Sequence, residues 1–248
     1  MGKPIIIAHR GASAYAPENT ISSFKKAIEM KAGGIEIDVH LTKDGHVVVA
    51  HDEKLGRTSN GSGLIKDFTL GELRELDFGS WFSSEFTNEK IPTLDETMDL
   101  LVDKDILLNI ELKNGPVFYP GIEKIVVDMI KKYNITEKVI ISSFNHYCLR
   151  EIKALAPDIK IGLLYSAGLY NPAEYAKMVG ADAIHPYYLS VHPDSIKNCK
   201  ENGILINVWT INNPDHIKLA IFAGADGIIT NYPDIALKIL HSSLLAVC

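Results

Sequence analysis

The chain has 248 residues, of which 46% are hydrophobic and 23% are charged, the composition of an ordinary globular protein with ample core. Its net charge is −6 and it has no run rich in Lys or Arg, so we expect no nucleic-acid partner. No segment approaches the roughly 18 continuous apolar residues of a spanning helix, so we expect no stable membrane insertion.

Short β-rich runs alternate with helical patterns from one end of the chain to the other. The runs are apolar almost throughout, which is typical of parallel strands covered on both faces. Eight such units predict a closed (β/α)8 TIM barrel, with a doubly wound open sheet as the alternative. The runs span 4–9, 34–41, 105–112, 138–144, 159–165, 182–186, 204–209 and 226–231, and the helical patterns include 20–31, 93–101, 119–133, 146–156, 193–202 and 214–223.

Residues typical of helix ends support these boundaries. Asn19 precedes the first helical pattern, and Pro214 lies near the start of a later one. The glycines expected just past helix ends are Gly33, Gly180, Gly203 and Gly224.

One segment interrupts the alternation after the second run. Lys43-Asp44-Gly45 predicts a hairpin turn, and 46–51 predicts an antiparallel return strand. Residues 52–92 are then too long for a plain loop and contain a short helical pattern at 69–76 and an aromatic patch at 79–86. We therefore predict a single barrel domain over 1–248 with an insertion subdomain at about 52–92. The insertion either caps the site or merely extends the structure.

Three acidic residues lie inside the apolar runs: Glu36 and Asp38 on the second, and Glu111 on the third. An unpaired charge is costly to bury, and residues two apart in a strand point to the same face. A cation would hold converging carboxylates together, and oxygen ligands without a Cys or His cluster favour Mg²⁺ or Ca²⁺. The alternative is a buried salt-bridge layer with Arg10 and Lys113.

Other polar residues lie where strands are expected to end, the face that carries the chemistry of such barrels. His9 and Arg10 follow the first run, His51 ends the hairpin, and Lys113 follows the third run. Arg10 and Lys113 leave a local charge near +1 when the carboxylates and a divalent cation are counted, which favours a phosphodiester. Two imidazoles suit the general acid and base that phosphodiester hydrolysis needs; each histidine alone is more often structural than catalytic, but two beside a metal site favour catalysis.

The remaining candidates are less specific. Trp209 is either a core residue or the floor of a substrate pocket, and His185 is an intermediate case at its strand end. The other histidines, His40 and His146 among them, are interpreted as surface or loop residues. Three scattered cysteines and an N-terminus without signal-peptide features predict a cytoplasmic enzyme with reduced thiols. Nothing in the residues predicts an oligomeric state.

Several short motifs also follow one another over nearly the whole chain. They are His9-Arg10-Gly11, Pro17-Glu18-Asn19-Thr20, Glu36-Ile37-Asp38, His51-Asp52, Ile91-Pro92-Thr93-Leu94, Glu111-Leu112-Lys113, Ser143-Phe144 and Val208-Trp209-Thr210. In these motifs the chain resembles the glycerophosphodiester phosphodiesterase family. The insertion after His51 fits the small extra subdomain of that family.

The resemblance implies a barrel enzyme that hydrolyses glycerophosphodiesters, such as glycerophosphocholine or glycerophosphoethanolamine, to sn-glycerol 3-phosphate and an alcohol. It implies Mg²⁺ or Ca²⁺ on Glu36, Asp38 and Glu111. It implies His9 and His51 as the acid–base pair, with either one as the acid. The substrate-binding residues would be Arg10 and Lys113 at the phosphate, and Phe144 and Trp209 beside the glycerol or leaving group.

Two alternatives stand beside this prediction. A barrel phospholipase that acts on intact lipids would need an apolar rim, for which Trp81-Phe82 is the candidate patch. A non-catalytic glycerophosphodiester-binding protein would keep the barrel but would have no use for an acid–base pair.

Overall fold

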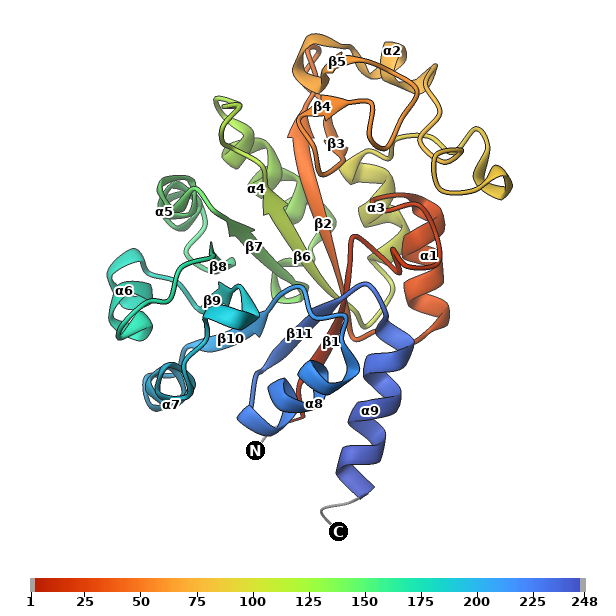
Figure 1. Cartoon of the computed structure of the whole chain (residues 1–248). Helices are drawn as coiled ribbons and strands as arrows, with labels where there is room; N and C mark the ends of the chain where they lie inside the picture. The colour runs from red at the N-terminus through yellow and green to blue at the C-terminus, as the bar shows by residue number, and fades with distance from the viewer. Residues whose placement is uncertain (1–2, 246–248) are drawn as a thin grey trace.

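Each of the eight predicted runs forms one strand of a closed parallel barrel, so the barrel prediction is confirmed (Figure 1). The computed structural model describes residues 3–245. The barrel closes because β1 pairs with both β2 and β11. The strands, in their order around the barrel, are β1 (Ile5–His9), β2 (Gly34–Leu41), β6 (Leu107–Leu112), β7 (Val139–Ser143), β8 (Lys160–Tyr165), β9 (Ala183–Pro186), β10 (Leu205–Val208) and β11 (Gly227–Thr230).

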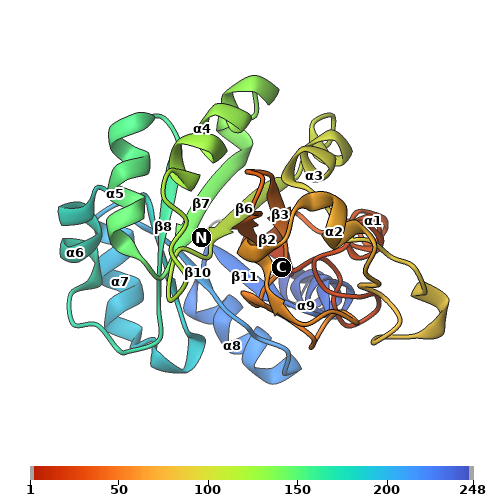
Figure 2. The ribbon, with the colours of Figure 1, turned by 90° about the horizontal axis from the view of Figure 1, so that it is seen from above.

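Helices follow the strands along the chain and form the outer layer, as the view from above shows (Figure 2). Pro214 begins one of them and Gly224 follows the end of that same helix, while Gly180 follows the end of another; the two glycines have left-handed φ angles of 86° and 85°, all as predicted. The helices are α1 (Ile21–Glu29), α3 (Leu94–Leu101), α4 (Ile122–Tyr133), α5 (His146–Leu155), α6 (Pro172–Val179), α7 (Pro193–Glu201), α8 (Pro214–Ala223) and α9 (Pro233–Leu245).

Two of the expected helix signals have other roles, and those predictions are wrong. The cap of α1 is Thr20, whose side chain accepts a hydrogen bond from the Ser23 N–H, while the Asn19 side chain binds Asp38. The helix already ends at Glu29. Gly33 directly precedes β2, and its N–H donates to the Ile6 carbonyl of β1.

Strand β2 uses its two faces differently. Ile35, Ile37 and Val39 are fully buried in the hydrophobic core that also contains residues of the surrounding helices. The alternate residues Glu36 and Asp38 lie on the opposite face of the strand. In the parallel register between β2 and β6, Asp38 lies opposite Glu111. The register therefore brings the acidic residues of the two strands together.

The predicted hairpin is present, and its return strand β3 (Val47–Val49) pairs antiparallel with β2. Residues 52–92, hereafter the insertion, follow it and contain β4 (Lys54–Leu55), β5 (Gly63–Leu64) and the helix α2 (Leu70–Arg74). The segment lies beside the β2–β3 hairpin, on one side of the barrel (Figures 1 and 2). It shares a small apolar core with the return strand of the hairpin, formed by Val48, Ala50, Ile65, Leu73, Phe78 and Ile91.

The aromatic patch of the insertion packs largely on itself. The rings of Trp81 and Phe82 meet edge to face with centroids 5.7 Å apart, and Phe82 meets Phe86 in the same way. The Trp81 indole also donates a hydrogen bond to the Phe78 carbonyl (2.9 Å). Trp81 nevertheless remains 40% exposed.

Within the described residues, no helix is long and apolar enough to cross a membrane. Cys148 and Cys199 are free and buried, as expected for structural thiols, and Cys248 lies outside the described residues.

Candidate active site

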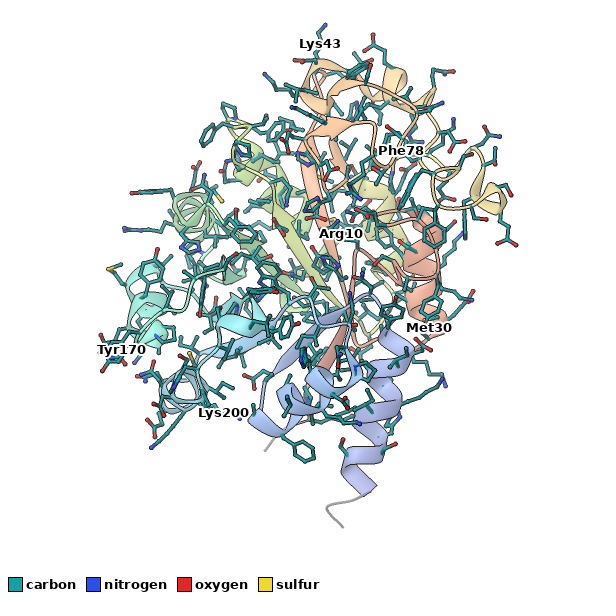
Figure 3. The ribbon with its side chains drawn as sticks, in the orientation of Figure 1. Arg10, Met30, Lys43, Phe78, Tyr170 and Lys200 are labelled. Carbon is teal, nitrogen blue, oxygen red and sulfur yellow. The ribbon has the colours of Figure 1, made fainter. Side chains whose placement is uncertain are left out.

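A small cavity of about 90 Å³ opens where the barrel strands end, and it collects nearly all of the predicted site residues. Arg10, labelled near the centre of Figure 3, lies at the end of β1. None of the residues that line the cavity comes from the insertion, which therefore lies beside the site rather than over it. The predicted residues in the lining are His9, Arg10, Glu36, His51, Glu111, Lys113, Phe144 and Trp209.

Asp38 is the one predicted residue outside this lining, because it is buried beneath it at 1% exposure. It still belongs to the site: ligand oxygens of Glu36, Asp38 and Glu111 all lie within 4.8 Å of one another. The three predicted metal residues therefore form one cluster. Their proximity follows from two-residue spacing on β2 and the register of β2 with β6.

Two cations flank this cluster, so part of the alternative salt-bridge layer is also present. Arg10 Nε lies 3.3 Å from Asp38 Oδ2, and Lys113 Nζ lies 3.5 Å from Asp38 Oδ1 and 2.8 Å from Glu111 Oε1. Asn19 donates a further hydrogen bond to Asp38 Oδ2 (2.9 Å). One face of the Asp38 carboxylate is thus fixed by neutral and positive donors.

The other oxygen of Asp38 fits a metal site. Asp38 Oδ1 is buried and accepts no hydrogen bond from the described residues; the Lys113 ammonium lies 3.5 Å away, at the outer limit of such a bond, which leaves this oxygen able to bind a cation. A donor set made only of carboxylate oxygens suits a hard divalent cation such as Mg²⁺ or Ca²⁺. The residues present therefore fit the predicted group.

The pKa values of the carboxyl groups report the same need for positive charge. Burial and the nearby Asp38 raise the pKa of Glu36 well above its usual value and that of Glu111 to about 7. For Asp38, burial is outweighed by Lys113 and Arg10, and its pKa is lowered. Without a cation, Glu36 and Glu111 therefore bind protons more readily than ordinary carboxyl groups do.

The turn after β1 is shaped to place Arg10. Arg10 has φ 55° and Gly11 has φ 79°, so two successive residues adopt the left-handed region. The left-handed conformation is unfavourable in free energy for any residue that has a side chain, and it is typical of functional sites. It directs the Arg10 N–H at Glu36 Oε2 (2.9 Å), and a side chain at Gly11 would collide with Ser23.

His9 is held as a neutral ring with its Nε2 toward the carboxylates. Its Nδ1 lies 2.7 Å from Asn231 Oδ1, which can only accept, so Nδ1 carries the proton. Its Nε2 then carries no proton; it lies 3.9 Å from Glu36 Oε2 and accepts a long hydrogen bond from the Thr210 hydroxyl (3.5 Å). Burial, together with Arg10, lowers the pKa of His9 to about 4, so the ring is unprotonated near neutral pH, the form in which it can accept a proton.

His51 has a different partner. Its Nδ1 donates to the Asp52 carboxylate at 2.6 Å, a charge-assisted bond that stabilises an imidazolium. Burial is the largest influence and lowers the pKa of His51 below its usual value, against the opposing effect of Asp38. The charged partner nevertheless makes His51 better placed than His9 to carry and donate a proton.

The aromatic wall consists of Phe144 and Trp209, whose rings meet edge to face at 5.6 Å. Phe144 is half exposed, whereas the Trp209 indole is fixed by a hydrogen bond to the His185 carbonyl (2.7 Å). His185 itself is fully buried, binds Asn207 and does not line the cavity. Trp209 is therefore part of the pocket wall, and the His185 side chain is not.

One histidine that supports the site was not predicted to do so. His40 was interpreted as a surface or loop residue, which is wrong: it is buried, bonds the Tyr119 hydroxyl and donates to the His51 carbonyl (3.1 Å). Its position two residues beyond Asp38 on β2 was the available signal. His146, interpreted in the same way, is half-buried, and its ring bonds the Leu164 carbonyl and a tyrosine.

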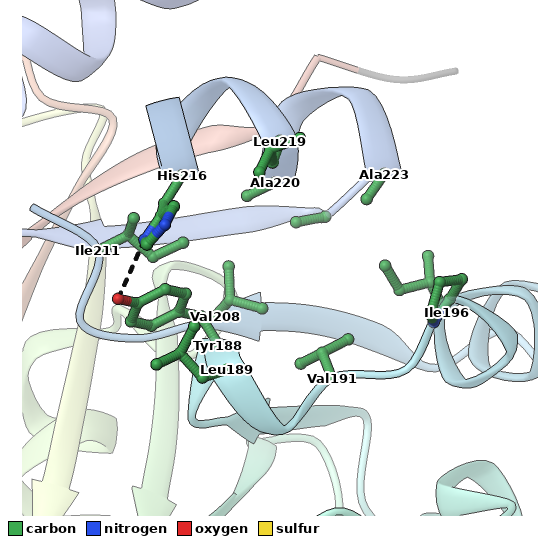
Figure 4. A pocket seen from close by; sticks show the side chains of 12 residues that line it. Tyr188, Leu189, Val191, Ile196, Val208, Ile211, His216, Leu219, Ala220 and Ala223 are labelled. Carbon is green, nitrogen blue, oxygen red and sulfur yellow. Dashed lines mark hydrogen bonds between the residues drawn. The ribbon is translucent and has the colours of Figure 1, made fainter. Parts of the chain in front are cut away.

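A larger cavity, of about 240 Å³, lies on the outside of the barrel at α7 and α8 (Figure 4). Its lining is almost wholly apolar, apart from a hydrogen bond between the Tyr188 hydroxyl and His216 Nδ1 (3.2 Å). It contains none of the carboxylates, cations or histidines described above. We therefore place the chemistry in the smaller cavity at the strand ends.

Comparisons with known proteins show the family to which the chain belongs. Residues 9–235 match the model of the glycerophosphoryl diester phosphodiesterase family. A glycerophosphodiester phosphodiesterase of Caldanaerobacter subterraneus subsp. tengcongensis is 50% identical over 239 residues, which cover 96% of this chain and 98% of the relative.

Solved structures give the same result. A phosphodiesterase from Oleispira antarctica, solved in complex with the product sn-glycerol-3-phosphate, aligns with a TM-score of 0.87 at 32% identity and covers 96% of this chain and 97% of that chain. A glycerophosphodiester phosphodiesterase from Thermotoga maritima aligns with a TM-score of 0.80 at 32% identity over 96% of this chain and 99% of that chain.

Proposed function

Because the chain belongs to the glycerophosphoryl diester phosphodiesterase family, we propose that it hydrolyses glycerophosphodiesters with a divalent cation and a histidine pair. The products would be sn-glycerol 3-phosphate and an alcohol, from substrates such as glycerophosphocholine or glycerophosphoethanolamine. The relative from Oleispira antarctica binds sn-glycerol-3-phosphate, which supports this choice of product. Membership of an enzyme family sets aside the non-catalytic alternative.

One observation carries the proposal: a carboxylate cluster, two cations and two histidines converge at the end of one barrel. Glu36, Asp38 and Glu111 would hold Mg²⁺ or Ca²⁺, which when bound supplies charge neutralisation and polarises a phosphoryl oxygen. Arg10 and Lys113 would contact the remaining phosphate oxygens. Their ion pairs to Asp38 and Glu111 hold them in place before substrate arrives.

The histidines would divide the proton transfers. Nε2 of His9, which carries no proton, would remove a proton from the attacking hydroxyl, whether of water or of the glycerol. His51 would give a proton to the alkoxide oxygen of the leaving alcohol, and Asp52 would stabilise the imidazolium before that transfer. Phe144 and Trp209 would pack beside the organic part of the substrate.

A coupled assay for glycerol 3-phosphate tests the proposal. We expect the purified chain to release glycerol 3-phosphate from glycerophosphocholine and glycerophosphoethanolamine in the presence of Mg²⁺ or Ca²⁺. Excess EDTA should abolish the release, and re-addition of the cation should restore it. Strong hydrolysis that survives EDTA would overturn the metal assignment, and no release from any glycerophosphodiester would overturn the substrate assignment.

A further inference from the structure

One arginine of the insertion reaches two residues beside the active site. Arg57 binds the Asp52 carboxylate through Nε (2.6 Å) and Nη2 (3.1 Å). The same guanidinium binds the Glu18 carboxylate through Nη1 (2.9 Å) and Nη2 (2.7 Å). Arg57 therefore holds two carboxylates from separate parts of the chain in one planar fork, a geometry that lysine cannot reproduce.

Each of these carboxylates has a second partner that faces the cavity. Asp52 Oδ1 accepts from His51 Nδ1 at 2.6 Å. Glu18 Oε1 accepts from Arg10 Nη1 at 2.7 Å. One guanidinium thus connects the ring of the proposed general acid with a cation proposed for the phosphate.

The electrostatics favour keeping both acids ionised. Burial opposes ionisation of Asp52, but its hydrogen bonds to Arg57 and His51 lower its pKa to about 2. The pKa of Glu18 is lowered in the same way, by Arg57 and Arg10 against burial. Both groups therefore remain acceptors for the site residues across the working pH range.

From these contacts we infer that Arg57 is a positioning residue for the reaction: it fixes Asp52 and Glu18, and through them the His51 ring and the Arg10 guanidinium. The inference rests on the proposed function, and it gives the insertion a role in catalysis without any insertion residue lining the cavity. Because the Arg57 side chain is 45% exposed, solvent screens its ion pairs and limits what they contribute to the stability of the fold. Its loss should therefore affect turnover far more than unfolding.

The insertion offers a matched control. Arg74 also forms an ion pair, with Glu96 at 2.6 Å, and its side chain is 34% exposed, but Glu96 has no contact with the catalytic groups. We expect Arg57→Gln to lower kcat by about 10- to 100-fold, the cost of a misplaced catalytic group, with a much smaller change in KM. Arg74→Gln should leave both near wild type. Arg57→Lys, which keeps the charge without the fork, should recover only part of the loss.

A double-mutant cycle tests whether Arg57 acts through Asp52. If it does, the combined loss of kcat in Arg57→Gln with Asp52→Asn falls short of the product of the single losses. Equal kcat in Arg57→Gln and Arg74→Gln, full activity of Arg57→Lys, or losses that simply multiply would each overturn the inference.

Crystal structures of Arg57→Gln and Arg74→Gln provide a readout that needs no substrate. The 2.6 Å contact between His51 and Asp52 should be lost or divided between rotamers in the first variant and kept in the second. An unchanged His51 ring in Arg57→Gln would overturn the inference. If wild type released no glycerol 3-phosphate, the proposed function would fail, and the His51 ring would still decide the positioning role.

Discussion

His9 and His51 differ in the group that holds Nδ1, and this difference assigns their roles in our proposal. Nδ1 of His9 bonds the neutral amide oxygen of Asn231, and Nδ1 of His51 bonds the carboxylate of Asp52. A ring paired with a carboxylate is stabilised when it carries a proton, whereas a buried ring on a neutral acceptor is not.

The two roles can be separated with substrates that differ in leaving group. We expect His51→Asn to lower kcat for glycerophosphocholine by about 10²- to 10⁴-fold, because its alkoxide needs a general acid. The loss should be much smaller for a p-nitrophenyl diester, whose leaving group departs without a proton. His9→Asn should slow both substrates alike, because a base acts on the nucleophile.

His146, a half-buried histidine outside the cavity, supplies the control, and His146→Asn should keep wild-type rates with both substrates. The reverse pattern, with His9→Asn sensitive to the leaving group, would exchange the two roles.

The count of charged residues around the site that was made from the sequence was incomplete. It included Arg10, Lys113 and the three carboxylates, which motifs and strand positions identify. The structure adds Glu18 beside Arg10, and the pair Asp52–Arg57 beside His51. Arg57 could not be found from the sequence, because it lies in a loop whose path no periodic pattern predicts.

At the scale of elements, strand β8 illustrates how the barrel interior limits side-chain size. A Cβ on Gly162 would lie 2.4 Å from Nε2 of the buried His185. We expect Gly162→Ala to lower the free energy of unfolding by about 1–3 kcal/mol, because the added methyl forces neighbours from their positions. Urea denaturation measures this change.

Gly71→Ala is the control for this change. Its Cβ would meet no atom closer than 4.0 Å, and alanine favours the helix α2. We expect stability equal to or slightly above wild type. Equal destabilisation by both substitutions would contradict a packing limit at Gly162.

The elements themselves were largely predictable, and the exceptions have physical causes. Apolar runs and glycine or proline signals placed the barrel strands to within a few residues. Helix α4 begins at Ile122 rather than near Tyr119, because Gly121 adopts a left-handed φ of 85° that the helix cannot include. Asn19 was taken for a cap because its long-range bond to Asp38 leaves no local signature.

At the scale of the whole molecule, the acidic cluster links cation binding to stability. Without a cation, the folded protein holds Glu111 at a pKa of about 7, against a usual value of 4.5, and the pKa of Glu36 is also raised. At pH values between 4.5 and about 7, the folded chain therefore binds more protons than the unfolded chain. The free energy of unfolding therefore falls as pH rises through this window.

A divalent cation replaces those protons, so its stabilising effect should grow with pH. We expect saturating Mg²⁺ or Ca²⁺ to raise the melting temperature more at about pH 8 than at about pH 5.5. Differential scanning fluorimetry with matched EDTA samples measures the shift. The shift should disappear in Glu36→Gln, and a shift that is larger at the lower pH would contradict the linkage.

We propose that β2 and β6 bring Glu36, Asp38 and Glu111 around one divalent cation, on which the chemistry depends. Anomalous diffraction from crystals soaked in Mn²⁺, used in place of Mg²⁺, tests this claim. We expect one anomalous peak with an oxygen of each carboxylate at about 2.0–2.6 Å. A fully active protein whose crystals show no peak at these residues, or a peak elsewhere, would contradict the claim.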